Sequence, residues 1–170
     1  MTMLNKVLIF ITVLLLINGA VLAMGPPPPA APPPPNDSCS NAIPIFSGNA
    51  CTTGTTEGAT TETGELQGCN TGNQTIWYSF LATNDSMGVT VNTAFIPLCY
   101  FGSAVWDGSG GCPPTSGAPL ACEDAAGGPF TQDYFFDNLV VGNTYYIQVS
   151  YGSGGPCGDG ITTACVSVND

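Results

Sequence analysis

The sequence predicts an all-β protein, a jelly-roll-like β-sandwich of about eight antiparallel strands stapled by disulfides. After residue 36, short β-branched and aromatic runs alternate with Gly, Asn, Asp and Pro turns, a spacing typical of sandwiches and jelly rolls. No segment of this region keeps the 3.6-residue apolar period of an amphipathic helix. The same region holds eight cysteines, an even set that is typical of a disulfide framework in an exported chain.

Composition divides the chain into three parts. Lys6 precedes an apolar run and a small-residue end at Ala23, which predicts a cleaved secretory signal peptide over residues 1–23. A retained membrane anchor is the alternative, but the run is short for a span and no basic stop-transfer cluster follows it. Residues 24–35 carry eight prolines and predict an extended polyproline II spacer, about 3.1 Å per residue, with a ligand for a proline-reading partner as the alternative. Residues 36–170 have the length of one domain.

The strongest predicted strand is Thr75–Ala82, which has apolar residues on both faces and should be a covered central strand. Residues 52–64 are polar and low in complexity, and we expect an edge strand with a loop there. Residues 141–144 have the composition of a hairpin turn. The other expected strands are residues 43–46, 88–93, 103–106, 120–122, 134–139, 144–150 and 164–168.

The charge is one-sided. Lys6 is the only Lys or Arg and there is no His, so the chain after the signal peptide has twelve carboxylates and no cationic side chain. Each carboxylate must therefore face water, accept hydrogen bonds or bind a cation. Nucleic acid is excluded as a partner, and anionic membrane surfaces are disfavoured, because both are bound mainly through Lys and Arg.

The same composition argues against an enzyme. Without His there is no Ser-His-Asp or Cys-His pair, and without Lys or Arg no clamp for an oxyanion or phosphate. Only paired carboxylates remain as catalytic groups. Glu57, Glu62 and Glu65 lie in a polar stretch that we expect to be flexible, which is a poor place for a rigid catalytic pair.

The cysteines predict four disulfides. Zinc is disfavoured because the chain has no C-x-x-C pair and no His. Eight cysteines allow 105 pairings, so spacing does not fix the connectivity. Cys112 with Cys122 is the most natural local pair, worth about 2–3 kcal/mol in the chain-entropy description. The eight residues are Cys39, Cys51, Cys69, Cys99, Cys112, Cys122, Cys157 and Cys165.

An ordered series of short motifs resembles the pre-peptidase C-terminal domains of secreted bacterial proteins, which are common in Bacteroidetes surface proteins. The series covers nearly all of residues 36–168 and comprises "NDSCSNAIPIFSGNACTTGTTEGATTE", "GC", "IWYSF", "VTVNT", "AVWDGSGGC", "LACED" and "LVVGNTYYIQVSYG". The resemblance implies a calcium-associated jelly-roll sandwich that is an accessory module rather than a catalytic unit. Cys99 and Cys157 are additional to the usual cysteines of that family, so we pair them with each other.

Calcium is the expected cofactor. Ca²⁺ takes six to eight oxygen ligands, and the candidate ligands are Asn36 and Asp37 at the start of the domain with Glu123 and Asp124 after Cys122. Two carboxylates about 5 Å apart repel by roughly 3 kcal/mol at an effective dielectric of 20, and a divalent ion would relieve that repulsion. The alternative is that each acid points into water, and adjacent residues in a strand do point to opposite faces. Asp107 is a weaker candidate that fits a turn.

Aromatic residues suggest a second kind of site. Tyr100, Trp106 and Tyr151 lie near predicted turns, where we expect them to be exposed and able to stack on sugars. A protein-binding face, including strand addition to a sheet edge, is equally open. The aromatic residues expected in the core are Trp77, Tyr78, Phe80, Phe135 and Tyr146.

These observations predict a secreted, non-catalytic, calcium-associated binding or adhesion module at the cell surface, with the periplasm as the alternative location. Its expected partner is an extracellular glycan or protein, and no stable membrane insertion is expected after signal cleavage. The alternative function is a self-assembling structural subunit of a surface layer or filament, tethered by the proline spacer.

Overall fold

The computed structural model describes residues 29–69, 72–94, 96–152 and 163–170. The predicted signal peptide lies outside the described residues. Residues 31–170 form one compact unit, so the last residues of the predicted spacer belong to it. Pro34 is buried, and its carbonyl oxygen accepts a hydrogen bond of 3.1 Å from the Asp37 amide. No helix among the described residues is long and apolar enough to cross a membrane.

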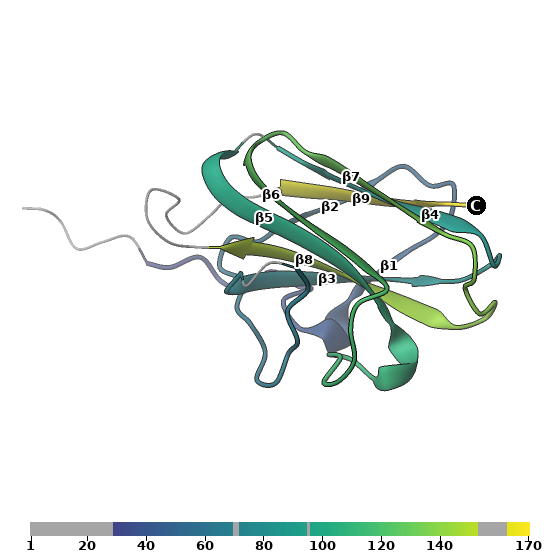
Figure 1. Cartoon of the computed structure of the whole chain (residues 1–170). Helices are drawn as coiled ribbons and strands as arrows, with labels where there is room; N and C mark the ends of the chain where they lie inside the picture. The colour runs from purple at the N-terminus through teal and green to yellow at the C-terminus, as the bar shows by residue number, and fades with distance from the viewer. Residues whose placement is uncertain (1–28, 70–71, 95, 153–162) are drawn as a thin grey trace, which may run out of the picture. The chain divides into compact units, whose positions relative to one another are not determined.

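Two β-sheets are stacked as layers, which confirms the predicted β-sandwich (Figure 1). Strands β2–β9 alternate between the sheets except for β5 and β6, which pair with each other; this is the jelly-roll arrangement. The first sheet has the order β1 (Ile43–Ile45), β3 (Gln74–Leu81), β8 (Thr144–Gly152), β5 (Ile96–Asp107) and β6 (Ala121–Gly128). The second has the order β2 (Thr52–Thr55), β9 (Thr163–Asn169), β4 (Met87–Thr93) and β7 (Thr131–Phe136). Two short 3₁₀ turns, η1 (Cys39–Asn41) and η2 (Gly108–Gly110), complete the elements.

Every predicted strand segment has its counterpart among the nine strands β1–β9 of the described residues. β2 is the edge strand expected within residues 52–64. β1 extends the first sheet beyond the eight jelly-roll strands and runs parallel to β3, whereas every other pairing is antiparallel. β5 begins at Ile96 rather than at residue 103, and β6 is longer than predicted because its pairing extends into the small residues 125–128, which carry little strand signal.

The main core lies between the two sheets. β3 contributes Ile76, Tyr78 and Phe80 to it, in agreement with the period of two in that strand. β8 contributes Ile147 and Val149 from the neighbouring position. The second sheet supplies the opposing inner face, made of Met87, Val89, Val91, Tyr134, Ala164, Val166 and Val168.

A second core covers the outer face of the five-stranded sheet. Trp77 and Trp106 are fully buried there, and Leu66 and Tyr146 pack against them. We call residues 56–69, which bring Leu66 to this face, the covering loop. The loop passes so close to Ala104 that a Cβ at Gly68 would have no room. The middle of the five-stranded sheet, around Trp77 and Trp106, is therefore buried on both sides.

The turn at residues 140–143 is not part of a hairpin, which corrects the prediction for residues 141–144. The Asn143 amide donates to the Val140 carbonyl at 3.0 Å, and Gly142 has φ of +87°, so the local turn chemistry is as expected. The strands on either side belong to different sheets, however, since β7 lies in the second sheet and β8 in the first. The turn carries the chain between layers.

Three disulfides are present among the described residues, and none of them joins Cys112 to Cys122. Cys112 pairs with Cys39, and Cys122 pairs with Cys69. The local pairing was wrong because Cys122 lies on the outer face of β6, beside the covering loop that carries Cys69, while Cys112 lies after η2 near η1. The third bond joins Cys51 to Cys165. The predicted bond of Cys157 with Cys99 lies outside the described residues.

Candidate functional site

The side-chain amide of Gln148 forms the centre of the second core. Gln148 is 1% exposed, and all four hydrogen-bonding positions of its amide are used. Nε2 donates to Oε1 of Glu65 at 2.7 Å and to the Leu66 carbonyl at 2.9 Å. Oε1 accepts from the Gly68 amide at 3.1 Å and from Nε1 of Trp106 at 3.3 Å. One residue of β8 thus holds three residues of the covering loop against the sheet.

Glu65 is a buried carboxyl group with no cation near it. Its Oε2 accepts from the Glu62 amide at 2.8 Å and lies 3.1 Å from Oγ1 of Thr75. Burial raises the pKa of Glu65 above its usual value of 4.5, against the opposing effect of its hydrogen bonds. The Thr75 hydroxyl has one hydrogen but faces two acceptors, Glu65 and the Thr60 carbonyl at 2.9 Å. If Glu65 is protonated, its carboxyl O–H can donate to the Thr75 hydroxyl oxygen while that hydroxyl donates to the Thr60 carbonyl.

Two other acids fix the N-terminal entry of the domain. Oε1 and Oε2 of Glu62 accept from the Ser38 hydroxyl at 2.8 Å and the Cys39 amide at 2.7 Å, at the start of η1. Asp37 accepts from the amide and hydroxyl of Thr60. The partners of these carboxylates are neutral hydrogen-bond donors, because the domain has no cationic side chain with which they could form salt bridges.

The polar stretch that contains Glu62 and Glu65 is therefore tied to the sheet, which corrects the expectation of flexibility. Sequence could not show this, because the partners of Glu65 lie 10 and 83 residues away. Both oxygens of Glu62 and of Glu65 are engaged by structural donors. The chemistry that this arrangement supports is anchoring of the covering loop.

The two acidic pairs proposed for calcium lie at opposite edges of the five-stranded sheet. The Trp77 amide donates to the Asn36 carbonyl at 2.9 Å, and Nδ2 of Asn36 returns a bond of 2.9 Å to the Trp77 carbonyl. From Trp77 the register runs across β8 and β5 to Cys122 on β6. Four strand spacings of about 4.8 Å separate the pairs by about 19 Å.

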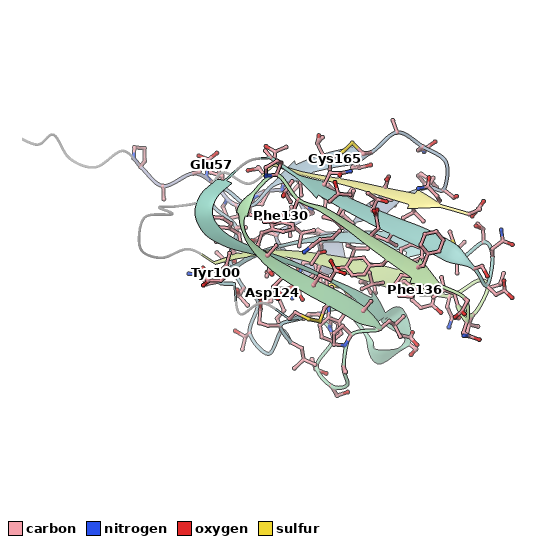
Figure 2. The ribbon with its side chains drawn as sticks, turned by 45° about the horizontal axis from the view of Figure 1, so that its top comes forward. Glu57, Tyr100, Asp124, Phe130, Phe136 and Cys165 are labelled. Carbon is pink, nitrogen blue, oxygen red and sulfur yellow. A yellow bond between two sulfur atoms is a disulfide. The ribbon has the colours of Figure 1, made fainter. Side chains whose placement is uncertain are left out.

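Ca²⁺ needs its ligand oxygens within about 2.6 Å of the ion. At a separation of about 19 Å, Asp37 therefore cannot share one ion with Glu123 and Asp124. Glu123 and Asp124 are exposed on β6, where they pair with Ser103 and Gly102 and point to opposite faces (Figure 2 labels Asp124). Among the described residues no three His, Cys, Asp or Glu side chains gather as a metal site. Asp107 caps η2 by accepting from the Ser109 amide at 2.8 Å, as a turn residue does.

Only one of the three aromatic residues expected to stack on sugars is exposed. Tyr100 is 60% exposed and projects from β5 (Figure 2). Trp106 and Tyr151 are fully buried, which corrects the expectation for both. Trp106 lies in the second core, which the sequence does not reveal because a loop rather than a strand covers it. Phe135, expected in the core, is 91% exposed on the outer face of β7 and lies over Gly88 of β4.

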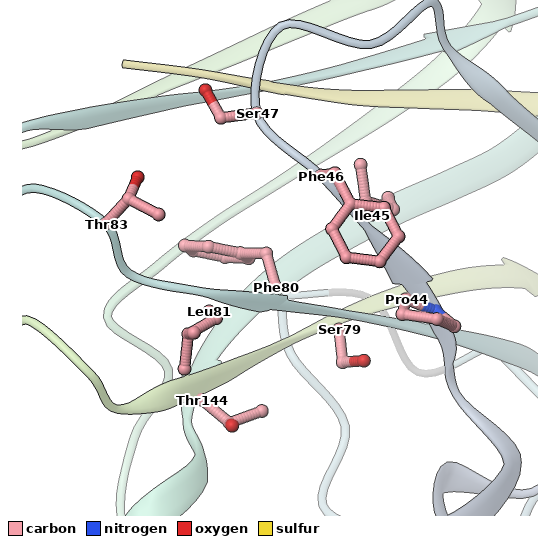
Figure 3. Close-up of a pocket in the computed structure, with 9 residues that line it drawn as sticks. All are labelled: Pro44, Ile45, Phe46, Ser47, Ser79, Phe80, Leu81, Thr83 and Thr144. Carbon is pink, nitrogen blue, oxygen red and sulfur yellow. The ribbon is translucent and has the colours of Figure 1, made fainter.

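An uncharged groove lies where β1 leaves β3 (Figure 3). It has a volume of about 260 Å³. The rings of Phe46 and Phe80 and the side chain of Leu81 form apolar walls, and Phe46 and Leu81 are 66% and 55% exposed. We call it the rim groove; its lining residues are Pro44, Ile45, Phe46, Ser47, Ser79, Phe80, Leu81, Thr83 and Thr144. The groove was not predicted from the sequence. The signal that could have indicated it is Phe46, an apolar residue that directly follows the short strand β1.

One of three comparisons with known proteins found a solved structure from the family that the motifs resemble. This chain is similar to the pre-peptidase C-terminal domain of collagenase from Bacillus anthracis. The similarity covers 75% of this chain and 94% of that one, with 16% sequence identity and a TM-score of 0.41. At these values it carries no argument about ligand or activity. No family model matches the sequence, and the curated proteins give no significant match.

Proposed function

We propose that this domain is a non-catalytic binding module that works outside the cytoplasm and holds its partner at the rim groove. The observation that carries the proposal is the absence of charge in the groove: none of its nine lining residues is ionisable, on a chain of net charge −11. An apolar hollow beside an exposed aromatic ring, here that of Phe46, is the usual character of a recognition site. Three disulfides are typical of proteins outside the reducing cytoplasm.

The non-catalytic part of the proposal rests on chemistry. The domain has no His, Lys or Arg after residue 6, and Glu65, the most buried acid among the residues that the structure describes, is engaged in anchoring the covering loop. A binding role at a cell surface, including adhesion, is the function that such a cross-linked sandwich with an open groove supports best. Self-assembly into a surface layer or filament is the second candidate. The acidic surfaces of two copies repel each other, so an uncharged groove is the part of the surface at which a second copy can bind.

The experiment compares beads coated with the wild-type domain, with Phe46→Ser and with Val141→Ser. Val141 is 59% exposed and lies outside the groove, so it is a matched control for the loss of an exposed apolar side chain. Bead adherence is measured on a glycan array and on a surface coated with the domain itself. We expect Phe46→Ser to abolish adherence and Val141→Ser to keep it. Equal adherence of the two variants, or a hydrolytic activity that one carboxylate variant removes, would contradict the proposal.

We also propose that Glu123 and Asp124 bind Ca²⁺ at the exposed β6 edge. The support is that no side-chain cation exists to offset two adjacent carboxylates. Since the two side chains point to opposite faces, each carboxylate would hold an ion on its own with water completing the coordination, and affinity no stronger than that of weak extracellular modules, about 10⁻⁴–10⁻³ M, is expected. Melting is compared in Ca²⁺ and in EDTA for wild type, Asp124→Asn and Asp37→Asn. A melting temperature that calcium leaves unchanged in the wild type rejects this site.

A further inference from the structure

We propose that the rim groove receives the proline-rich segment of a second copy of this chain, so that copies join head to tail. The inference rests on the proposed function, because it names the occupant of the same groove. The segment is residues 24–35, "MGPPPPAAPPPP", and the part that docks is residues 24–30, which precede the compact unit of residues 31–170.

The groove and the segment have complementary hydrogen-bonding chemistry. A proline has no backbone N–H, so a polyproline segment offers carbonyl acceptors and apolar rings but very few donors. The groove offers aromatic and aliphatic walls together with the hydroxyl groups of Ser47, Ser79 and Thr144, which can donate to carbonyls. Polyproline helices dock on aromatic-lined grooves and lose little entropy when they bind, because they are already extended.

Charge also favours this occupant. Two copies of a chain with net charge −11 repel wherever their acidic surfaces meet. Residues 24–35 carry no charged side chain, and neither does the lining of the groove. The carboxylate that touches the lining is Asp170, whose Oδ1 accepts from the Thr83 hydroxyl at 2.7 Å. An acidic peptide is disfavoured beside it, whereas an uncharged segment is not.

The proline-rich segment joins the domain at Asn36, a residue that is held in place. Asn36 is 1% exposed and is held to Trp77 by the two hydrogen bonds of 2.9 Å. The carbonyls of Ala31 and Pro32 lie against Gly58, where a Cβ would collide with them. The proline segment is thus attached to a rigid body rather than to a loose linker, which limits the entropy lost when it docks on another copy.

Such a contact is heterologous, because the donating segment and the receiving groove are different surfaces. Each copy that donates its segment still has an empty groove, and each copy that receives one still has a free segment. Contacts of this kind do not saturate in a dimer; they build open chains unless the rotation between copies closes a ring.

The first experiment measures the oligomeric state by sedimentation over a range of protein concentrations. Four proteins are compared: residues 24–170, residues 31–170 (the compact unit, which contains every strand), Phe46→Ser and Val141→Ser. We expect species larger than dimers to grow with concentration in residues 24–170 and in Val141→Ser. They should be absent from residues 31–170 and from Phe46→Ser. A melting curve for each protein confirms that it is folded.

The second experiment titrates a synthetic peptide of residues 24–35 into residues 31–170, with a Gly/Ser peptide of equal length as the control. Amide shifts should change at the groove, and Phe46→Ser should weaken the binding about tenfold or more, which corresponds to about 1.4 kcal/mol. A peptide that binds while residues 24–170 stay monomeric would mean that each copy fills its own groove, which overturns the proposal. Adherence that depends on Phe46 without peptide binding would overturn this occupant and leave the proposed function intact.

Discussion

Gln148 and Glu65, which are 83 residues apart in the chain, meet in a buried hydrogen bond of 2.7 Å on the outer face of the five-stranded sheet. The bond joins the middle of β8 to the covering loop. Because Gln148 also holds Leu66, Gly68 and Trp106, this side chain determines whether the outer face of the sheet is a second core or an open surface.

Replacing Gln148 with Leu should destabilise the domain by about 3–5 kcal/mol, because four buried polar groups lose their partners at once. The covering loop should also open before the rest unfolds. A Glu-specific protease is the right probe, since the loop contains Glu57, Glu62 and Glu65 and trypsin has no site in residues 7–170. We expect rapid cleavage in this loop under native conditions.

Gln132→Leu is the matched control for that variant. Gln132 is 3% exposed, but its Oε1 accepts from Ser103 between the two sheets, away from the covering loop. This change should lower stability without selective cleavage of the loop. Equal cleavage of both variants would show that Gln148 has no special role in anchoring.

The raised pKa of Glu65 predicts a pH dependence of stability. The folded state holds the proton more strongly than the unfolded state, whose pKa is near 4.5. The contribution of Glu65 is therefore fully present below that pH and is lost as pH rises through the folded-state pKa. Urea unfolding of wild type and Glu65→Gln from pH 4.5 to about 8 isolates this effect, because the other acids are common to both. The wild type should lose stability relative to Glu65→Gln as pH rises; a constant difference would contradict the assignment.

The disulfide connectivity is checked by mass spectrometry of the unreduced protein after cleavage by chymotrypsin at aromatic residues and Leu, which places Cys39, Cys69, Cys112 and Cys122 in different peptides. Peptides that contain Cys112 and Cys39 should remain linked, as should those that contain Cys122 and Cys69. Replacing Cys69 and Cys122 together with Ser should cost about 4 kcal/mol, since that bond closes a long loop. Detection of a peptide linked through Cys112 and Cys122 would refute this pairing.

Replacing Trp106 should lower the stability of the domain, whereas replacing Tyr100 should affect only sugar binding. Trp106→Ala should cost about 3–5 kcal/mol, because it empties the second core and removes a donor to Gln148. Tyr100→Ala should change stability by less than about 0.5 kcal/mol, because the side chain is exposed. Thermal melting measures both effects. A glycan-array signal that is lost in Tyr100→Ala and kept in Phe46→Ser would place sugar binding at Tyr100 rather than at the rim groove.

The sequence predicted the strands well because alternation is a local property. In β3 the period of two placed Ile76, Tyr78 and Phe80 on the inner face. The same rule explains an error in β7, where Gln132 and Tyr134 point inward and Phe135 therefore points outward. Among adjacent aromatic residues only the register of the neighbouring strand decides which one is buried, and that register is not visible in one segment.

The second core could not be predicted in the same way. Trp106 and Tyr151 lie near turns in the sequence, and the burial of Trp106 comes from a loop that folds back over the sheet. The loop is held by Gln148, a polar residue in an apolar strand, and by Cys69. Contacts of this kind join segments that are tens of residues apart, so neither periodicity nor spacing indicates them.

The bond between Cys51 and Cys165 has a mechanical consequence. If a force pulls on the domain between its proline tether and the end of β9, tension passes directly from Cys51 to Cys165 across a separation of 114 residues. Most of the sandwich is excluded from the load path, so only the short stretch before Cys51 and the last residues after Cys165 can lengthen. Strands β2 to β8, which lie between the two cysteines, are thereby shielded from a pull that would unravel an unlinked sandwich strand by strand.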